Sequence, residues 1–159
     1  MRHRQGVGRF REGTGVKHWL LLAASAAGLI GAAPVGQPQP LSMALAGLRS
    51  TKGQILVCVA RLPSYFPDCS KDPDKRHFIV PAKGGPVPLG QLAPGTYAIA
   101  LIHDENGNGK LDTFAGIPRE GVGFSRNPVL RFGAPSFRSA SFAVAGGAVE
   151  QDIKLKYFL

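Results

Sequence analysis

Glycine and proline recur so often along this chain that long helices have little room. The 159 residues include 21 glycines and 13 prolines, and both residue types disfavour helix interiors and favour turns. Short apolar runs lie between these breaks, and hydrophobic residues make up 44% of the chain against 18% charged residues. Such a chain is too apolar to stay disordered. The pattern therefore predicts one domain built from many short strands.

Residues 1–33 have the pattern of a secretory signal. Five basic residues and one acidic residue come first, followed by an uncharged apolar run at 19–30 and small residues at 31–33. The run is too short for a membrane-spanning helix, which needs about 20 residues. We expect cleavage near residue 33, leaving a linker at 34–40 and a folded domain at 41–159; the alternative is an uncleaved anchor. We interpret residues 1–15 as an over-extended start, because residues 16–19 (VKHW) look like the usual short start of such a signal, with Val16 at the place of an alternative initiation codon.

The charge of the chain belongs partly to this signal. The formal net charge is +9, which by itself suggests a nucleic-acid partner. Removal of residues 1–33 would take five of the 19 basic residues and one of the ten acidic residues, leaving a charge of +5. The remaining basic residues are scattered and form no stripe. We therefore expect a periplasmic or secreted protein with no nucleic-acid partner and no membrane insertion after signal cleavage.

Two cysteines, Cys58 and Cys69, are the only ones in the chain. In an oxidising compartment the first expectation for such a pair is a disulfide. Closing a loop of this size would stabilise the fold by about 2 to 3 kcal/mol in the chain-entropy model. The alternative is one buried thiol on a strand and one exposed thiol.

Alternating apolar residues indicate strands. In residues 96–102, Tyr97, Ile99 and Leu101 share one face and small apolar residues share the other, which is typical of a central strand. Residues 41–48 and 54–60 flank a short polar turn and predict a hairpin. Further strands are expected at 77–80, 89–92, 129–132, 142–144 and 149–158. About seven short strands, with no amphipathic helical window, predict an all-β, antiparallel Greek-key β-sandwich.

One loop has the spacing of a calcium site. It follows the predicted central strand and, numbered from Asp104, matches the pattern D-x-[DN]-x-[DN]-G, with Gly109 at position 6. Calcium prefers six to eight oxygen ligands, and alternate side chains of a tightly curled loop point to its inside. The oxygen donors at these positions are Asp104, Asn106, Asn108, the backbone carbonyl of Lys110, and Asp112.

The loop departs from the EF-hand at its end. Position 12, where a glutamate closes the calcium shell, is Ala115, and Glu120 is the only nearby acid that can take its place. With so few carboxylates we expect weak Ca²⁺ binding, with a Kd of about 10⁻⁴ to 10⁻³ M. The alternative is a hairpin turn in which Asp104 and Asn106 cap their own backbone.

Three motifs in order resemble an uncharacterised family of exported bacterial proteins, the domain of unknown function 2141. They are residues 92–100 (LAPGTYAIA), 103–112 (HDENGNGKLD) and 116–125 (GIPREGVGFS). The resemblance covers roughly residues 41–158 and implies an export signal and a compact β domain, but no activity. The first motif alone is also similar to transthyretin-like and collagen-adhesin-type sandwich modules.

These observations favour an exported binding or accessory module whose calcium loop stabilises the fold. Its partner would be an envelope protein or a polysaccharide, bound by the loops at one end of the domain. The alternative is a metal-assisted hydrolytic enzyme that uses the same acidic loop. A third possibility is an envelope protein that associates with itself through an exposed apolar patch.

Overall fold

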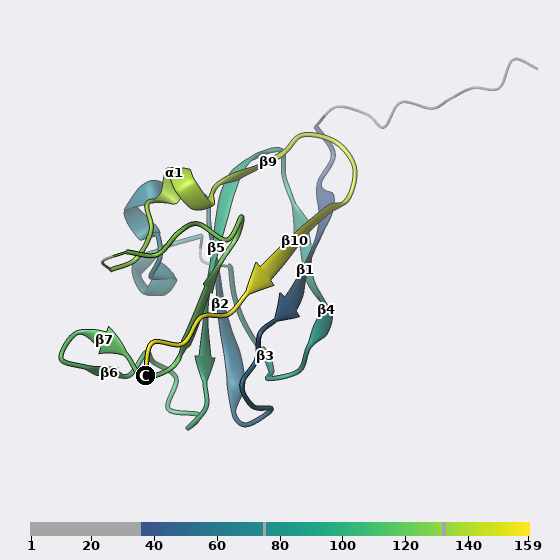
Figure 1. The fold of residues 1–159 in the computed structure, drawn as a ribbon. Helices are drawn as coiled ribbons and strands as arrows, with labels where there is room; N and C mark the ends of the chain where they lie inside the picture. The colour runs from purple at the N-terminus through teal and green to yellow at the C-terminus, as the bar shows by residue number, and fades with distance from the viewer. Residues whose placement is uncertain (1–35, 75, 132) are drawn as a thin grey trace, which may run out of the picture. The chain divides into compact units, whose positions relative to one another are not determined.

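The structure, a computed structural model, describes residues 36–74, 76–131 and 133–159, and the predicted signal lies outside them. The described residues confirm an all-β fold (Figure 1). The strands are β1 (Gln39–Ala46), β2 (Gln54–Ala60), β3 (Arg76–Pro81), β4 (Gly85–Leu92), β5 (Gly95–Asp104), β6 (Thr113–Phe114), β7 (Ile117–Pro118), β8 (Gly121–Phe124), β9 (Phe142–Val144) and β10 (Val149–Lys154). The helices are short: two 3₁₀ turns, η1 (Pro63–Tyr65) and η2 (Cys69–Lys71), and α1 (Phe137–Ala140).

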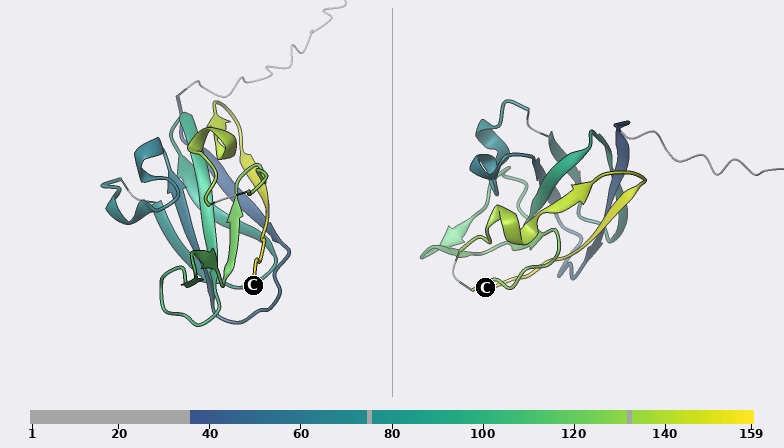
Figure 2. Two further views of the ribbon diagram at one scale, coloured as in Figure 1. Left: turned by 60° about the vertical axis from the view of Figure 1, so that its left-hand side comes forward. Right: turned by 90° about the horizontal axis from the view of Figure 1, so that it is seen from above.

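Two sheets pack face to face. The smaller has the strand order β10-β1-β4, and the larger has the order β3-β2-β5-β8, with β9 pairing the first residues of β5. β6 and β7 form a separate hairpin. Figures 1 and 2 show that the 3₁₀ turns, α1 and the β6–β7 hairpin lie on the side of the larger sheet that faces away from β1. We call this side the outer face.

The predicted hairpin of residues 41–48 and 54–60 is wrong. β1 pairs in parallel with β10, from Leu41–Val149 to Ala46–Lys154, and antiparallel with β4, whereas β2 belongs to the other sheet. The physical reason is burial. In a hairpin the apolar faces of both strands would point the same way, but on opposite sheets they face each other across the core. The β1–β10 pair also departs from the expected purely antiparallel arrangement.

The main core lies between the two sheets. The alternation predicted for β5 is confirmed, because Tyr97, Ile99 and Leu101 are all buried in this core, and β5 is central, with partners on both edges. Alternate residues of β2, β1 and β10 complete it; its fully buried members include Met43, Ile55, Val57, Ile99 and Ile153. Among the residues that the structure describes, those of the core all belong to 41–157, so the domain has a hydrophobic core of its own.

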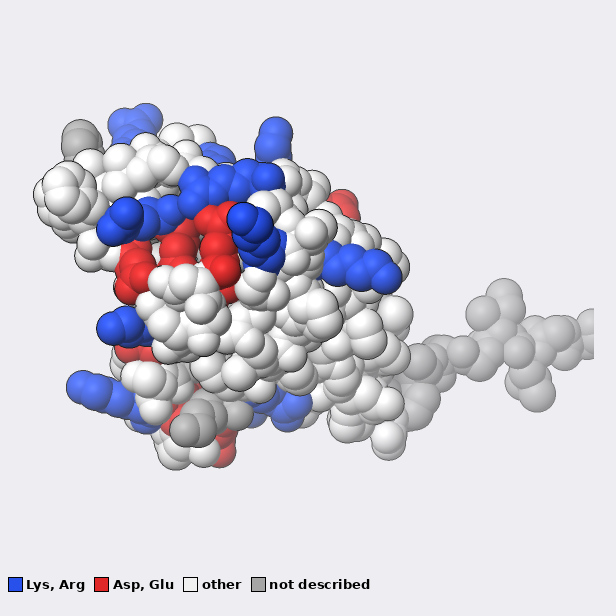
Figure 3. Space-filling model, turned by 90° about the horizontal axis from the view of Figure 1, so that it is seen from below, with Lys and Arg blue, Asp and Glu red and all other residues white. Residues whose placement is uncertain are grey.

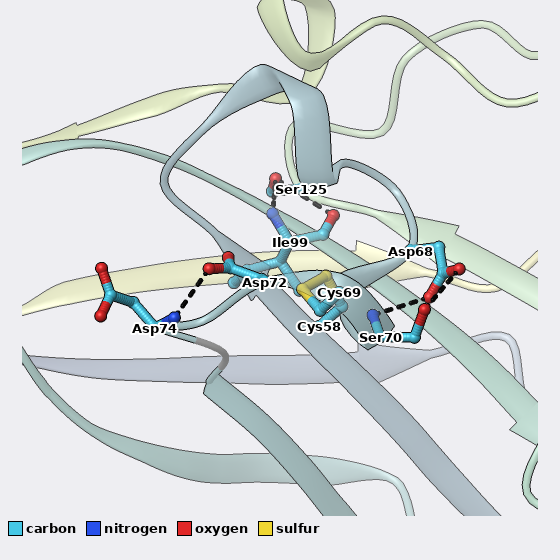
Figure 4. The surroundings of a disulfide bond; sticks show 8 residues. All are labelled: Cys58, Asp68, Cys69, Ser70, Asp72, Asp74, Ile99 and Ser125. Carbon is cyan, nitrogen blue, oxygen red and sulfur yellow. Dashed lines mark hydrogen bonds between the residues drawn. A yellow bond between two sulfur atoms is a disulfide. The ribbon is translucent and has the colours of Figure 1, made fainter.

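A second cluster covers part of the outer face. Cys58, Ala98 and Ala100 of the sheet pack there against Phe124 and residues of the loops above. The predicted disulfide is confirmed: Cys58 and Cys69 are bonded, with their Cα atoms 5.6 Å apart. Figure 4 shows how this bond ties η2 to β2. Asp68 caps η2 by accepting hydrogen bonds from the backbone N–H and the hydroxyl of Ser70.

Other expected elements differ in extent. Residues 129–131 form no strand, and residue 132 is outside the described residues; Val129 and Arg131 are exposed in a loop, whereas Leu130 is partly buried. The strand at 149–158 is regular only as far as Lys154, and β8 was not expected, since two of its four residues are glycines. Within the described residues, no helix is long and apolar enough to cross a membrane.

Candidate functional site

The candidate loop begins where β5 ends. Asp104 is the last residue of β5 and is fully buried, whereas residues 106–111 are exposed. Gly53, in the turn before β2, lies directly against this point, and a Cβ at residue 53 would overlap the carbonyl oxygen of Asp104. Gly53 also has a φ of +69°, which other residues rarely adopt. Glycine at this position therefore allows the turn to pack on the base of the loop.

Hydrogen bonds join all six predicted ligand residues. The side-chain amides of Asn106 and Asn108 both donate to Asp112 Oδ2, at 2.7 and 2.9 Å respectively. The two oxygens of Asp104 accept from the backbone N–H groups of Asn108 and Gly109, at 3.0 and 2.8 Å. The backbone N–H of Lys110 donates to Asn108 Oδ1, and that of Asp112 donates to Glu120 Oε2. The loop is therefore curled around its polar side chains, as its spacing predicts.

Asx turns of the expected kind are present. Asn106 Oδ1 accepts from the N–H of Asn108 at 3.1 Å, so Asn106 and Asp104 both cap the loop backbone. In the part of the chain that the structure describes, no three His, Cys, Asp or Glu side chains are arranged to hold a metal ion. The amide NH₂ groups occupy the space in front of Asp112. A cation would have to displace these two hydrogen bonds.

Glu120 is the unusual residue of the loop. Its side chain is 96% buried, since its relative exposure is 4%. One carboxylate oxygen, Oε2, accepts from the N–H of Asp112 at 3.0 Å, but Oε1 is buried and has no hydrogen-bond partner among the described residues. Leaving a buried charged oxygen unpaired is costly.

The pKa values of the two buried carboxyl groups shift in opposite directions. Burial raises the pKa of Glu120; the N–H of Asp112 opposes this, and the negative charges of Asp104 and Asp112 add to it. Burial would also raise the pKa of Asp104, but hydrogen bonds from Gln54 and from the loop backbone outweigh it, so that pKa is lowered. The loop thus concentrates negative charge that its own hydrogen bonds compensate at Asp104 but not at Glu120.

His103 is occupied by structural contacts. The side chain is fully buried, and its ring nitrogens lie 2.7 Å from Tyr157 Oη and 2.8 Å from the carbonyl oxygen of Lys52. Because a carbonyl can only accept, Nε2 carries the proton and the tyrosine hydroxyl donates to Nδ1. Gly121 makes room for the ring of Tyr157, which a Cβ at that position would overlap. Sequence alone gives no sign of this pairing, because the partners are 54 residues apart.

An ion pair borders the loop. Arg49 binds Glu105 through both Nε and Nη2, and its guanidinium lies over the ring of Tyr157, with Cζ 4.5 Å from the ring centroid. Ser50 also donates to Glu105, at 2.7 Å. Figure 3 shows acidic side chains gathered between basic ones at this end of the domain. Neither Arg49 nor Glu105 was predicted as a site residue: Arg49 lies in a turn without a recognisable motif, and Glu105 is at a position of the calcium-loop pattern that does not bind the ion.

A large cavity lies beside the loop on the outer face. Its volume is about 970 Å³, and Gly109, Lys110 and Leu111 of the loop form part of its wall. Among the described residues that line it, none is Asp104, Asp112 or Glu120. The carboxylates of the loop therefore do not open into this cavity.

A family model matches most of this domain. The family described as "uncharacterized protein conserved in bacteria (DUF2141)" matches residues 43–152, from within β1 to within β10. The chain belongs to this family. The resemblance inferred from three sequence motifs is thus confirmed, and the whole candidate loop lies inside the DUF2141 region. No curated protein and no solved structure matches the chain significantly.

Proposed function

We propose that this DUF2141 protein is an exported binding module whose loop 104–120 takes up one Ca²⁺ ion that stabilises the fold. The observation that carries the proposal is the unpartnered Oε1 of Glu120, buried in a loop that already holds Asp104 and Asp112. A divalent cation would supply the missing partner and offset the mutual repulsion of the three carboxylates.

The donor set suits calcium. Carboxylate, side-chain amide and backbone carbonyl oxygens are hard ligands, which calcium prefers, and the described loop has neither cysteine nor histidine between residues 104 and 120. Rotation of the Asn106 and Asn108 amides would turn their carbonyl oxygens toward the ion in place of the NH₂ groups that now contact Asp112. The cost is the loss of those two hydrogen bonds, which is consistent with the weak binding expected from the ligand count.

A structural role for the ion is favoured over a catalytic one. A catalytic metal needs an open position beside a substrate pocket, but the carboxylates of the loop do not line the neighbouring cavity. Gln54 of β2 and the N–H of Asp112 hold the two buried carboxylates in place. An ion bound there would tie the end of β5 to the segment before β8.

The export part of the proposal rests on the signal-like residues 1–33 and on the disulfide. A disulfide is stable in the periplasm or outside the cell, whereas the cytosol keeps thiols reduced. The end of the domain shown in Figure 3 carries acidic side chains gathered between basic ones, which suits a polar partner, an envelope protein or a polysaccharide.

Calorimetric titration of residues 34–159 with calcium chloride tests the ion site. We expect one saturable event with a Kd of about 10⁻⁴ to 10⁻³ M. Asp112→Asn should abolish it, because this carboxylate is the point on which both amides converge. Asp152→Asn, at an exposed position of β10, is the matched control and should leave it unchanged. Absence of saturable heat up to tens of millimolar calcium would reject the site.

A further inference from the structure

The cavity on the outer face has an apolar floor built from the larger sheet. Leu56 of β2, Ile102 of β5 and Val122 of β8 are cross-strand neighbours and all line it. Its volume of about 970 Å³ is at the upper end of the range of about 300 to 1,000 Å³ for small-molecule sites.

The walls come from separate segments, one of them covalently held. Residues 67–70 form one wall, and the disulfide between Cys69 and Cys58 fixes this wall to the floor. The loop at 109–111 and the β6–β7 hairpin form another, and residues 130, 131, 133 and 134 with Phe158 form a third. The site is therefore formed without a ligand, which reduces the entropic cost of binding.

Exposed apolar side chains surround the opening. Leu111, Ile117 and Phe158 line the cavity, yet they remain 37%, 44% and 45% exposed. Large apolar side chains gathered around a concave surface are typical of a site that buries a hydrophobic ligand.

The charged side chains at the cavity are mainly cationic. Lys110 and Arg131 line it, and neither forms an ion pair with a described residue. Asp68 is the one carboxylate among the described lining residues, and both of its oxygens already accept hydrogen bonds from Ser70. The opening therefore has free positive charge next to an apolar floor.

We propose that this cavity binds one anionic amphiphile, a long-chain carboxylic acid, with its hydrocarbon chain on the floor of the sheet and its carboxylate beside Lys110 and Arg131. Complementary charge selects the head group and apolar burial supplies most of the affinity. This site goes beyond the calcium loop. Its test is run in both EDTA and calcium, so that failure of one proposal is distinguishable from failure of the other.

The probe is cis-parinaric acid, a fluorescent fatty acid, compared with its uncharged methyl ester. We expect saturable, one-to-one fluorescence enhancement with the full chain and with residues 34–159, and tighter binding of the acid than of the ester. Lys110→Gln and Arg131→Gln should each raise the Kd of the acid about 2- to 5-fold, as for loss of an exposed ion pair, and leave that of the ester unchanged. Lys83→Gln, at an exposed position that does not line the cavity, is the control.

A second pair of variants tests the floor. Ile102→Trp fills the cavity and should raise the Kd of acid and ester at least about tenfold, which corresponds to about 1.4 kcal/mol. Ile79→Trp is the matched control, because Ile79 of β3 lies on the same face of the sheet, beyond Leu56 of β2. It is 62% exposed and does not line the cavity. The charge variants do not touch the floor, so the test stands even if Ile102→Trp fails to fold.

Four results would overturn the proposal. The first is no saturable enhancement with either chain, and the second is equal affinity for acid and ester. The third is binding by residues 34–159 alone, which would make the N-terminal segment the occupant. The fourth is a dimer, measured by sedimentation, that Ile102→Trp dissociates while no probe binds; the occupant would then be a second copy of the chain.

Discussion

Glu120→Gln should have opposite effects on stability without and with calcium. In EDTA the charged side chain places an unpartnered oxygen in a buried site beside two other carboxylates. Glutamine removes the charge, keeps an oxygen that can accept from the N–H of Asp112, and offers an NH₂ group to the neighbouring carboxylates. Relief of a buried, unsatisfied polar group is worth about 1 to 3 kcal/mol, so we expect the variant to be more stable by about that amount.

Calcium should reverse the order. If the Kd is about 10⁻⁴ to 10⁻³ M, then 10 mM calcium stabilises the native chain by about 1.4 to 2.7 kcal/mol. For a domain of this size that is a rise in Tm of about 5 to 10 °C. The variant, which lacks one carboxylate ligand, should gain much less. Thermal unfolding followed by circular dichroism, in EDTA and at 10 mM calcium, measures both effects.

The pH dependence supplies an internal check. Because the folded-state pKa of Glu120 is raised, the native chain loses stability as pH increases from its ordinary pKa, about 4.5, through the raised value. Below that window Glu120 is protonated and resembles glutamine, so the advantage of the variant in EDTA should disappear. Glu150→Gln, at an exposed position of β10, is the control. A variant that is less stable than the native chain in EDTA, or that keeps the full calcium shift, would refute the reasoning.

Three further predictions concern the scaffold around the loop. Replacing both Cys58 and Cys69 by alanine should lower the free energy of unfolding in urea by about 3 kcal/mol, as the chain-entropy model gives for a loop of 11 residues; an unchanged midpoint would contradict this. Tyr157→Phe should cost about 1 to 3 kcal/mol, because Nδ1 of buried His103 loses its hydrogen-bond donor, and a loss below 0.5 kcal/mol, on the order of an ordinary surface substitution, would reject the pairing. The hydrogen bond from the Arg49 guanidinium lowers the pKa of Glu105. The ion pair therefore stabilises the fold fully above about pH 4.5, and this stabilisation is lost as pH falls through the lowered pKa. Glu105→Gln should therefore reduce the free energy of unfolding at pH 7 by about 1 kcal/mol and leave it unchanged at pH 2. Equal losses at both pH values would exclude the ion pair as the cause.

Sequence patterns were informative where the signal is local. The alternation of apolar residues in β2 and β5 identifies the buried face of each strand, because successive side chains point to opposite sides of a sheet. The cysteine pair was predictable for a similar reason: only two cysteines exist, and the short loop between them can be closed by one bond. The curl of the candidate loop follows from the spacing of its aspartates, asparagines and glycines, which hydrogen bond to backbone groups a few residues away.

Partners distant in the sequence were not predictable. β1 looked like half of a hairpin with β2, yet it pairs with β10, about a hundred residues later. Alternation reports which face of a strand is apolar, but it is the same whether that face packs against a neighbour or against an opposing sheet. The pairing of His103 with Tyr157 and the ion pair of Arg49 with Glu105 have no sequence signal for the same reason.

The sequence by itself therefore determined an all-β domain, a disulfide and a polar loop, since each depends on residue types and short spacings. Only the tertiary structure decided that Glu120 keeps a buried oxygen without a partner and that the outer face leaves a cavity beside the loop. Both features are defined by what other segments fail to cover. A missing hydrogen-bond partner or a cavity depends on how sheets, turns and the C-terminal residues pack together, and no periodicity along the chain indicates it.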